Sequence, residues 1–395
     1  MTALAVPMLS SAHLPAVPVR VAVIGASGYT GAELLRLLWT HPAVALTLVA
    51  AKRAAGKSLA DVFPQFAGVT SALIEEFDPA GVAARADVAF CALPHGESAH
   101  TVAALRAHGV RVLDLSADYR LADTQQWQAW YSSDGQPHPH AALLATAVYG
   151  LPERHRTAIA NAALVAVPGC YPTATILAAA PLLAAGLVVP RRLIVDAKSG
   201  VSGAGRTPSL ASHFPEIAEG IRAYKVAGTH RHTPEIEQEL QRAAGGYSPA
   251  ALPDPANSPL APPPAAIAAS ATPPLRVLFT PHLVPMSRGI LACVYGEAAH
   301  AKVSTAALHA CLQAAYRDEP FVSVLPIGTL PDTALVRGSN RAHVGAYFDE
   351  RSGQVIALAA IDNLVKGAAG QAVQCFNLMC GMPETAGLRL TPMFP

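Results

Sequence analysis

The chain has 395 residues, enough for two domains that each bury a hydrophobic core. Its 28 Lys and Arg residues balance 27 Asp and Glu residues, which argues against a nucleic-acid surface and against a polybasic membrane patch. The longest apolar stretch, 176–189, contains Pro181 and is shorter than the roughly 20 residues that a membrane helix needs. Six cysteines without a CxxC pair argue against disulfides and zinc sites, and favour a reducing cytoplasm.

The first predicted element is a strand, a glycine turn and a helix. Residues 1–18 lack the basic start of a signal peptide and are expected to form a loose tail. A β-rich run over 20–24 then leads into a G-x-x-G-x-x-G turn and a helical pattern, the context that a dinucleotide-binding loop requires. A tight turn without a ligand is the alternative. The cofactor-binding residues predicted here are Gly25, Ser27, Gly28, Tyr29, Thr30 and Gly31.

The second predicted strand, 44–50, ends where a dinucleotide-binding domain usually carries an acidic residue for the adenosine ribose. Lys52 and Arg53 stand there instead. Basic side chains suit a ribose 2′-phosphate, so the pair favours NADP(H) over NAD(H). A solvated pair of charges at a strand end is the alternative interpretation.

Two further buried strands are predicted over 86–93 and 110–115, with a helix over 98–107 between them. Alternating strands and helices indicate an α/β fold with a parallel, doubly wound sheet. Pro94 and His95 then fall at the carboxyl end of a strand, where such sheets bind ligands. For His95, a local hydrogen bond within the loop is an equal alternative to a cofactor contact.

The run VPGCYPT places Cys170 directly after Pro168 and Gly169, at the start of an apolar helix that is predicted to stop at Pro181. A helix N-terminus carries partial positive charge and free N–H groups, which would lower the cysteine pKa from about 8.5 and favour the thiolate. Cys170 is therefore a candidate nucleophile. The alternative is a small buried hydrophobe in a tight turn.

Two later loops carry groups that suit anions and proton transfer. A strand over 193–198 leads into the glycine-rich loop 199–206, which can cradle an anion or a nicotinamide amide and which ends in Arg206. His230 and His232 precede a helix that is predicted to have Thr233 as N-cap. Either histidine could move a proton near neutral pH. A metal site is improbable because no third ligand is evident.

The remaining chain predicts more strands around one low-complexity segment. Residues 245–274 are mostly Pro, Ala and Ser and are expected to form a surface insertion. Strands over 275–279 and 290–296 flank a turn that carries His282 and Arg288, the latter a second candidate for binding anions.

The C-terminal part is predicted to return to the first domain. Strands over 342–348 and 355–361 precede an amphipathic helix over 363–379. If this helix packs on the Rossmann-type domain, the catalytic domain is an insertion between its two parts.

Nine motifs together resemble N-acetyl-γ-glutamyl-phosphate reductases, relatives of aspartate-semialdehyde dehydrogenase. The resemblance runs from about Val19 to Leu388 apart from the insertion. One departure is Val167, where the family usually has asparagine. The motifs are GASGYTGAELLRLL, ALPHG, DLSADYR, YGLP, PGCYPT, SGVSGAGR, HRHTPEIEQ, PHLVPMSRGI and DNLVKGAAGQAVQ.

The resemblance implies a Rossmann-type NADP-binding domain over 19–167 plus 362–395, and an α+β catalytic and oligomerisation domain over 168–361. It implies that Cys170 is the nucleophile and that His232, with His230 as its rival, is the acid/base. The expected assembly is a homodimer or homotetramer. Further cofactor contacts are expected from Ser199, Gly200, Gly203 and Asn363, and substrate contacts from Arg120, Arg206, Glu235, His282 and Arg288.

The activity that this resemblance implies is the NADPH-dependent reduction of N-acetyl-L-glutamyl 5-phosphate through a Cys170 thioester, in arginine biosynthesis. The same architecture could serve aspartyl phosphate or N-acetyl-aminoadipyl phosphate. Two alternatives of another class are a Cys–His hydrolase and a catalytically silent NADPH-binding sensor. The two glycine-rich loops and the Lys52–Arg53 pair argue against the hydrolase, because a hydrolase has no use for a dinucleotide.

Overall fold

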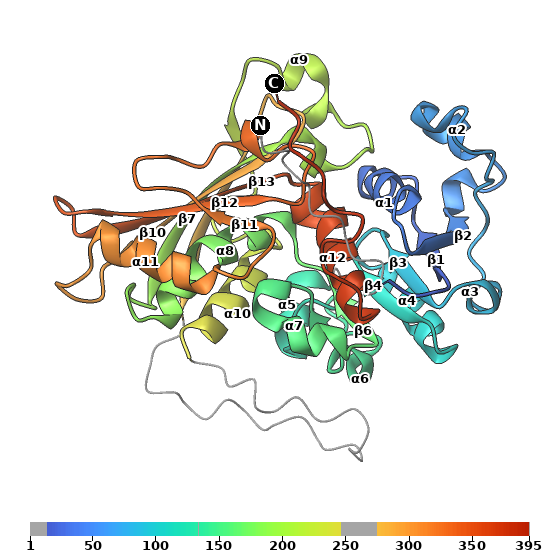
Figure 1. The fold of residues 1–395 in the computed structure, drawn as a ribbon, viewed down its shortest axis with the longest axis horizontal. Coiled ribbons are helices and arrows are strands. Elements are labelled where there is room, and N and C mark those ends of the chain that lie inside the picture. The colour runs from blue at the N-terminus through green and yellow to red at the C-terminus, as the bar shows by residue number, and fades with distance from the viewer. Residues whose placement is uncertain (1–13, 133, 246–274, 395) are drawn as a thin grey trace, which may run out of the picture. The chain divides into compact units, whose positions relative to one another are not determined.

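The computed structural model describes residues 14–132, 134–245 and 275–394 (Figure 1). The predicted insertion and most of the predicted N-terminal tail lie outside these ranges. Within these ranges the chain forms two compact units: the first comprises the described residues up to Ser116, Val148–Val167 and Ala369–Arg389, and the second comprises the other described residues. Residues 117–147, which the sequence analysis placed in the Rossmann-type domain, belong to the second unit.

The first unit is built on a six-stranded parallel sheet with the strand order β2-β1-β3-β4-β6-β5, which confirms the predicted doubly wound fold. Its strands are β1 (Val19–Ile24), β2 (Val44–Ala50), β3 (Val88–Cys91), β4 (Arg111–Asp114), β5 (Val148–Tyr149) and β6 (Leu164–Ala166). Its helices are α1 (Tyr29–Trp39), α2 (Leu59–Val62), α3 (Pro79–Arg85), α4 (Ser98–Ala107), α7 (Pro152–Ala160) and α12 (Gly370–Met379).

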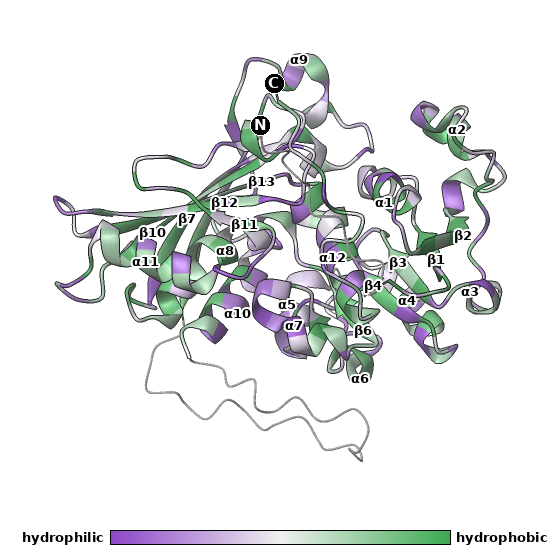
Figure 2. Cartoon of the chain, viewed as in Figure 1, coloured by the Kyte–Doolittle hydropathy of each residue, from purple (hydrophilic) through white to green (hydrophobic). Residues whose placement is uncertain are grey.

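The strands of this sheet are apolar because helices cover both of its faces. All four residues of β3 are buried, as expected for a central parallel strand, and the strands are mostly green in Figure 2. Helix α12 is buried on nearly every side, so the amphipathic prediction for it is wrong. Its polar side chains bond to backbone instead, for example Gln371 Nε2 to the Gly150 carbonyl at 2.8 Å and Asn377 Nδ2 to the Ala386 carbonyl at 2.9 Å.

The second unit contains a seven-stranded mixed sheet with the order β11-β12-β13-β10-β7-β9-β8. Helices α8, α10 and α11 pack on it (Figure 1). Its strands are β7 (Arg192–Gly200), β8 (Arg222–Ala223), β9 (Arg276–Val284), β10 (Ile290–Glu297), β11 (Val322–Val324), β12 (Ala342–Asp349) and β13 (Gln354–Ile361). Its helices are α5 (Thr124–Tyr131), α6 (Ala141–Leu144), α8 (Cys170–Ala184), α9 (Phe214–Ile217), α10 (Thr233–Ala243) and α11 (Thr305–Ala315).

Two predicted element ends in this unit are wrong. Helix α8 continues through Pro181 to Ala184, because the Leu177 carbonyl that loses its N–H partner accepts the Tyr316 hydroxyl at 2.6 Å instead. Strand β9 runs to Val284, beyond its predicted end at residue 279.

Burial alternates along the central strands of this sheet. On β7 and β9, every second side chain is buried, while most of the intervening side chains are exposed or half-buried. The paired residues Ile194 and Leu278 are 43% and 52% exposed on this outer face. Across the described ranges, no helix combines the length and the apolar character needed to span a bilayer.

Candidate active site

The three glycines of the loop after β1 have three different surroundings in the first unit. Gly25 has a φ of +82°, and a Cβ there would lie 2.6 Å from the Ala92 carbonyl oxygen. A Cβ on Gly31 would lie 2.5 Å from the Ala26 carbonyl oxygen, so this glycine allows the helix to pack on the loop. Gly28, the N-cap of α1, faces open space. These are the roles of tight turn, helix packing and ligand approach in a dinucleotide-binding loop.

The other predicted cofactor residues of the first unit also lie at strand ends. Lys52 and Arg53 are exposed in a short 3-10 helix directly after β2. Pro94 and His95 follow β3, which pairs with β1 where the strand order reverses. Ligands of open α/β sheets bind at such a reversal.

In the second unit, Cys170 is the first residue of α8, as predicted, and it is half-buried. Gly169 is the N-cap, with no side-chain hydrogen bond to the helix end. The expected lowering of the thiol pKa is wrong. Burial raises the pKa of Cys170 to about 11, although the N–H groups of Tyr171 and Cys170 and the charge of Arg120 oppose this rise. The resting group is therefore a thiol, and it needs a base.

His232 lies beside the residue that precedes this thiol. It is the N-cap of α10, one residue earlier than predicted, and it is buried. A Cβ on Gly169 would lie 2.7 Å from Cε1 of the His232 ring. Burial, followed by the neighbouring His230, holds the pKa of His232 well below its usual value. The ring is therefore neutral at pH 7 and can accept a proton.

His230 bonds to the backbone of His232. Its Nδ1 accepts the backbone N–H of His232 at 3.1 Å. Its ring meets those of Tyr171 and Phe279 edge to face, at centroid distances of 5.7 and 5.1 Å. Burial lowers the pKa of His230 to about 3. Of the two histidines, His232 is the one whose ring lies against Gly169.

Two predicted substrate-binding residues, Glu235 and Arg120, lie at the turn before Cys170. Glu235 is fully buried in the first turn of α10, and its Oε1 accepts the Gly169 N–H at 2.8 Å. Arg120 Nη1 lies 3.3 Å from Glu235 Oε2. The ion pair thus connects residues 117–147 to the turn that carries the thiol.

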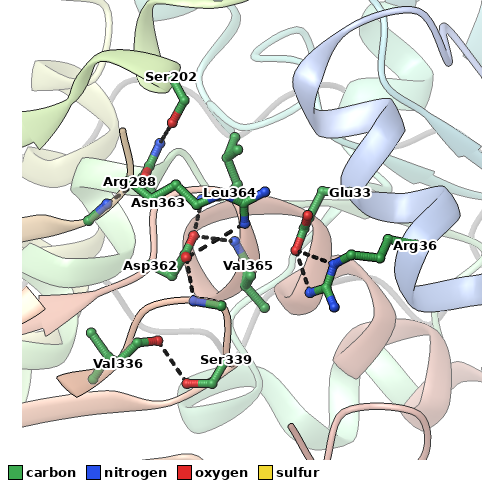
Figure 3. Close-up of polar contacts among 12 residues, drawn as sticks. Glu33, Arg36, Ser202, Arg288, Val336, Ser339, Asp362, Asn363, Leu364 and Val365 are labelled. Atoms are coloured by element: carbon green, nitrogen blue, oxygen red, sulfur yellow. Dashed lines mark hydrogen bonds and ion pairs between the residues drawn. The ribbon is translucent and has the colours of Figure 1, made fainter. Parts of the chain in front are cut away.

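A second group of loops meets at the end of β13. Asn363 Oδ1 accepts the Gly289 N–H at 2.8 Å, and its Nδ2 donates to Ser202 Oγ at 2.9 Å (Figure 3). This amide joins the glycine-rich loop to the loop that carries Arg288. A Cβ on Gly200 would lie 2.8 Å from the backbone nitrogen of Arg288, so the backbones of these two loops pack directly against each other.

The remaining predicted residues lie elsewhere in the second unit. Arg206 is exposed on its loop. The His282 side chain is on the outer face of the sheet, 3.2 Å from Asp196 Oδ1, and the structure does not bring it to Cys170. Ser199 lies near the end of β7 and Gly203 in the loop that follows, where a Cβ on Gly203 would lie 2.9 Å from Ser199 Oγ. Within the described ranges, no three His, Cys, Asp or Glu side chains gather as metal ligands do.

Two residues of the turn beside the thiol, Gly367 and Asp362, were not predicted from the sequence. Gly367 lies in a π-turn, Val365–Ala369, and a Cβ there would be 2.7 Å from the Cys170 Cβ. Asp362 is fully buried and caps this turn. A glycine inside a helical pattern is a usable signal, because it costs about 1 kcal/mol and so indicates a packing reason.

Comparisons with known proteins agree with this architecture. Residues 20–162 match the family described as "Semialdehyde dehydrogenase, NAD binding domain", and residues 170–253 and 265–363 match "Semialdehyde dehydrogenase, dimerisation domain". Aspartate semialdehyde dehydrogenase II of Vibrio cholerae has the same fold, with a TM-score of 0.65 at 18% identity over 92% of this chain and 98% of that one. The enzyme of Candida albicans, solved with NADP, also has a TM-score of 0.65 at 18% identity, over 92% and 99% of the two chains. These matches to both domains place the chain in the broad class of semialdehyde dehydrogenases.

Relatives that are similar in sequence identify the family within this class. The N-acetyl-γ-glutamyl-phosphate reductase of Geobacter sp. (strain M21) is 49% identical over 95% of this chain and 99% of its own length. That of Desulfotalea psychrophila is 44% identical over 95% and 100%. The chain belongs to the N-acetyl-γ-glutamyl-phosphate reductase family.

Proposed function

We propose that this chain reduces N-acetyl-L-glutamyl 5-phosphate to N-acetyl-L-glutamate 5-semialdehyde and releases phosphate, a step of arginine biosynthesis, through a thioester on Cys170. The observation that carries the proposal is the arrangement around Gly169. A thiol opens helix α8, and a buried neutral imidazole, His232, packs against the residue before it. A nucleophile with an adjacent base is the arrangement that acyl transfer requires.

The protonation states of Cys170 and His232 support a first step in which the histidine acts as the base. The Cys170 thiol has its pKa raised to about 11, and the pKa of His232 is well below its usual value, so both groups are neutral at pH 7. His232 therefore takes the thiol proton as Sγ attacks the γ-carbonyl carbon. The bond from that carbon to the phosphate oxygen breaks, the proton passes to the departing phosphate, and the acyl group remains on sulfur.

The end of helix α8 stabilises the charge that develops on the carbonyl oxygen. Its first N–H groups have no side-chain cap, and each such donor is commonly worth about 3 kcal/mol in a transition state. A bound reduced nicotinamide supplies the hydride that turns the thioester into a hemithioacetal. Collapse of the hemithioacetal breaks the carbon–sulfur bond, gives the aldehyde, and returns Cys170 to the thiol with a proton delivered through His232.

The first unit is an NAD(P)-binding domain, and its residues favour the phosphorylated cofactor. Gly28 leaves open space at an uncapped helix end, so a pyrophosphate fits there. Lys52 and Arg53 are exposed directly after β2 and suit a 2′-phosphate. We therefore infer that NADP(H) is the cofactor.

The second unit matches a dimerisation domain, and we infer that its outer sheet face joins two copies of the chain. The exposed pair Ile194 and Leu278 lies at neighbouring positions of β7 and β9. Leu278→Glu should lower the mass measured by light scattering. Val69→Glu, at a 48% exposed site in the first unit, should leave that mass unchanged and is the control.

The test of the reaction is NADP+ reduction in phosphate buffer with N-acetylglutamate 5-semialdehyde, for wild type and Cys170→Ala. Phosphate-dependent formation of NADPH that disappears in the variant supports substrate, cofactor and nucleophile together. Aspartate semialdehyde serves as the comparison substrate. Turnover that survives in Cys170→Ala would overturn the thioester, and release of phosphate from the acyl phosphate without oxidation of NADPH would indicate a hydrolase.

A further inference from the structure

The carboxylate of Asp362 contacts two separate parts of the candidate site. Its Oδ1 accepts the N–H groups of Leu364 and Val365 at 2.8 and 3.0 Å (Figure 3). Its Oδ2 accepts the Gly338 N–H at 2.7 Å and lies 3.7 Å from Arg288 Nη1. The carboxylate is fully buried, and a buried charge is stable only when such partners satisfy it.

The Oδ1 atom of Asp362 caps the turn that lies beside the nucleophile, Cys170. By capping Leu364 and Val365 it starts the π-turn, and the Gly367 N–H then bonds to the Asp362 carbonyl at 2.9 Å, a bond across five residues. This bond presses Gly367 against Cys170, where a Cβ would lie 2.7 Å from the cysteine Cβ and 3.2 Å from its Cα. The π-turn is therefore one wall of the space around the thiol.

The Oδ2 atom of Asp362 faces a cation, the guanidinium group of Arg288. The Arg288 side chain is 25% exposed, whereas that of Asp362 is not exposed at all, so a buried charge holds a guanidinium that reaches solvent. Arg288 adjoins Gly289, whose N–H is held by Asn363, so the backbone of this loop is fixed as well. A fixed guanidinium suits an anionic substrate group.

We propose that Asp362 is a positioning residue with a divided role, in which Oδ1 sets the wall beside Cys170 and Oδ2 orients Arg288 toward the substrate's anionic group. The inference rests on the proposed function, because it takes Cys170 as the nucleophile and an acyl phosphate as the substrate. It predicts that the two roles can be separated by substitution.

Asp362→Asn separates them, because one amide oxygen can still cap the π-turn while the NH₂ group faces the donors of Gly338 and Arg288. Asp362→Ser also keeps a cap and removes the charge. In the reverse reaction, both variants should raise the KM for phosphate about tenfold, with kcat and the rate of Cys170 alkylation by iodoacetamide within about twofold of wild type. Added to Arg288→Met, neither variant should raise the KM further.

Gly367→Ala tests the other side. The added methyl should lower both kcat and the alkylation rate about tenfold while the KM for phosphate is kept. The control for this variant is Gly345→Ala, where a Cβ would make an ordinary contact at 3.7 Å. The control for Asp362→Asn is Asp349→Asn, because Asp349 also lies 3.6 Å from an arginine and accepts that residue's N–H, on a hairpin away from this site.

Several results would overturn the inference. One is an unchanged KM in Asp362→Asn, and another is an equal loss of kcat, phosphate affinity and alkylation. If Asp362→Asn and Asp362→Ser both lose cooperative thermal unfolding, Asp362 is purely structural and the inference is rejected. Failure of the proposed function is a separate result, since wild type itself would then show no phosphate-dependent NADPH formation.

Discussion

Helices α1 and α8 begin in similar ways and meet different surroundings. Each has a glycine N-cap, Gly28 or Gly169, with no side-chain cap and no acidic residue in the first turn. A Cβ on Gly28 would meet nothing within 4 Å, whereas one on Gly169 would press on the ring of His232. An open helix end suits the anion of a ligand, and a closed one holds a reactive group of the protein itself.

His232→Gln should have the largest effect, because it removes the base from the closed helix end. Loss of a general base typically costs 10²–10⁴-fold, so we expect kcat to fall about 10³-fold. The measurement is steady-state NADPH formation at pH 7. His300→Gln, at an exposed site in the same unit, is the control. Retention of a tenth of the activity by His232→Gln would assign the base to another residue.

Exchanging glycine for alanine at both helix ends tests the comparison directly. Gly169→Ala forces the His232 ring away, and a displacement of about 1 Å can cost about 10²-fold in kcat. Gly28→Ala should leave kcat and thermal stability intact, because its φ of −89° is ordinary and the space is open. It should raise the KM for NADPH instead. Equal effects of the two variants on kcat would remove the distinction between the helix ends.

Sequence reasoning was most successful where the chemistry is local. The glycine loop after β1 and the start of α8 at Cys170 follow from residues adjacent in the chain, and both are present. The pKa of Cys170 was predicted in the wrong direction, because the local helix end lowers it while burial by distant segments raises it more. Pro181 was misjudged for a similar reason, since the hydroxyl that compensates for it comes from Tyr316.

Hydrogen bonds between residues far apart in the chain could also not be predicted from the sequence. Glu235 was predicted to contact substrate, and nothing in its motif indicated that its carboxylate holds the Gly169 N–H. Asp362 was overlooked because a lone aspartate at a strand end is common, and only the fold places its oxygens against Gly338 and the π-turn. Residues whose role depends on partners far along the chain need the structure.

The two buried histidines near the start of α8, His230 and His232, should also make the free energy of unfolding depend on pH. Burial lowers the pKa of His230 to about 3 and that of His232 well below its usual value, so the unfolded chain binds more protons below pH 6.5. Stability is therefore complete above about pH 6.5 and falls as the pH drops, by up to about 1.4 kcal/mol per pH unit for each histidine. Denaturant unfolding at pH 7, 6 and 5 measures this slope. His230→Phe should flatten it, and an unchanged slope in that variant would contradict the assignment.

The smallest expected effect concerns the open helix end and its cofactor. Lys52 and Arg53 are exposed, so each contact with a 2′-phosphate is screened and should be worth about 1 kcal/mol, roughly fivefold in the KM for NADPH. Lys52→Ala should therefore raise the KM for NADPH about fivefold and leave the KM for NADH unchanged, because NADH lacks that phosphate. Lys57→Ala, at another exposed lysine of the first unit, is the matched control. Equal shifts for the two cofactors would indicate that Lys52 acts on the shared part of the dinucleotide.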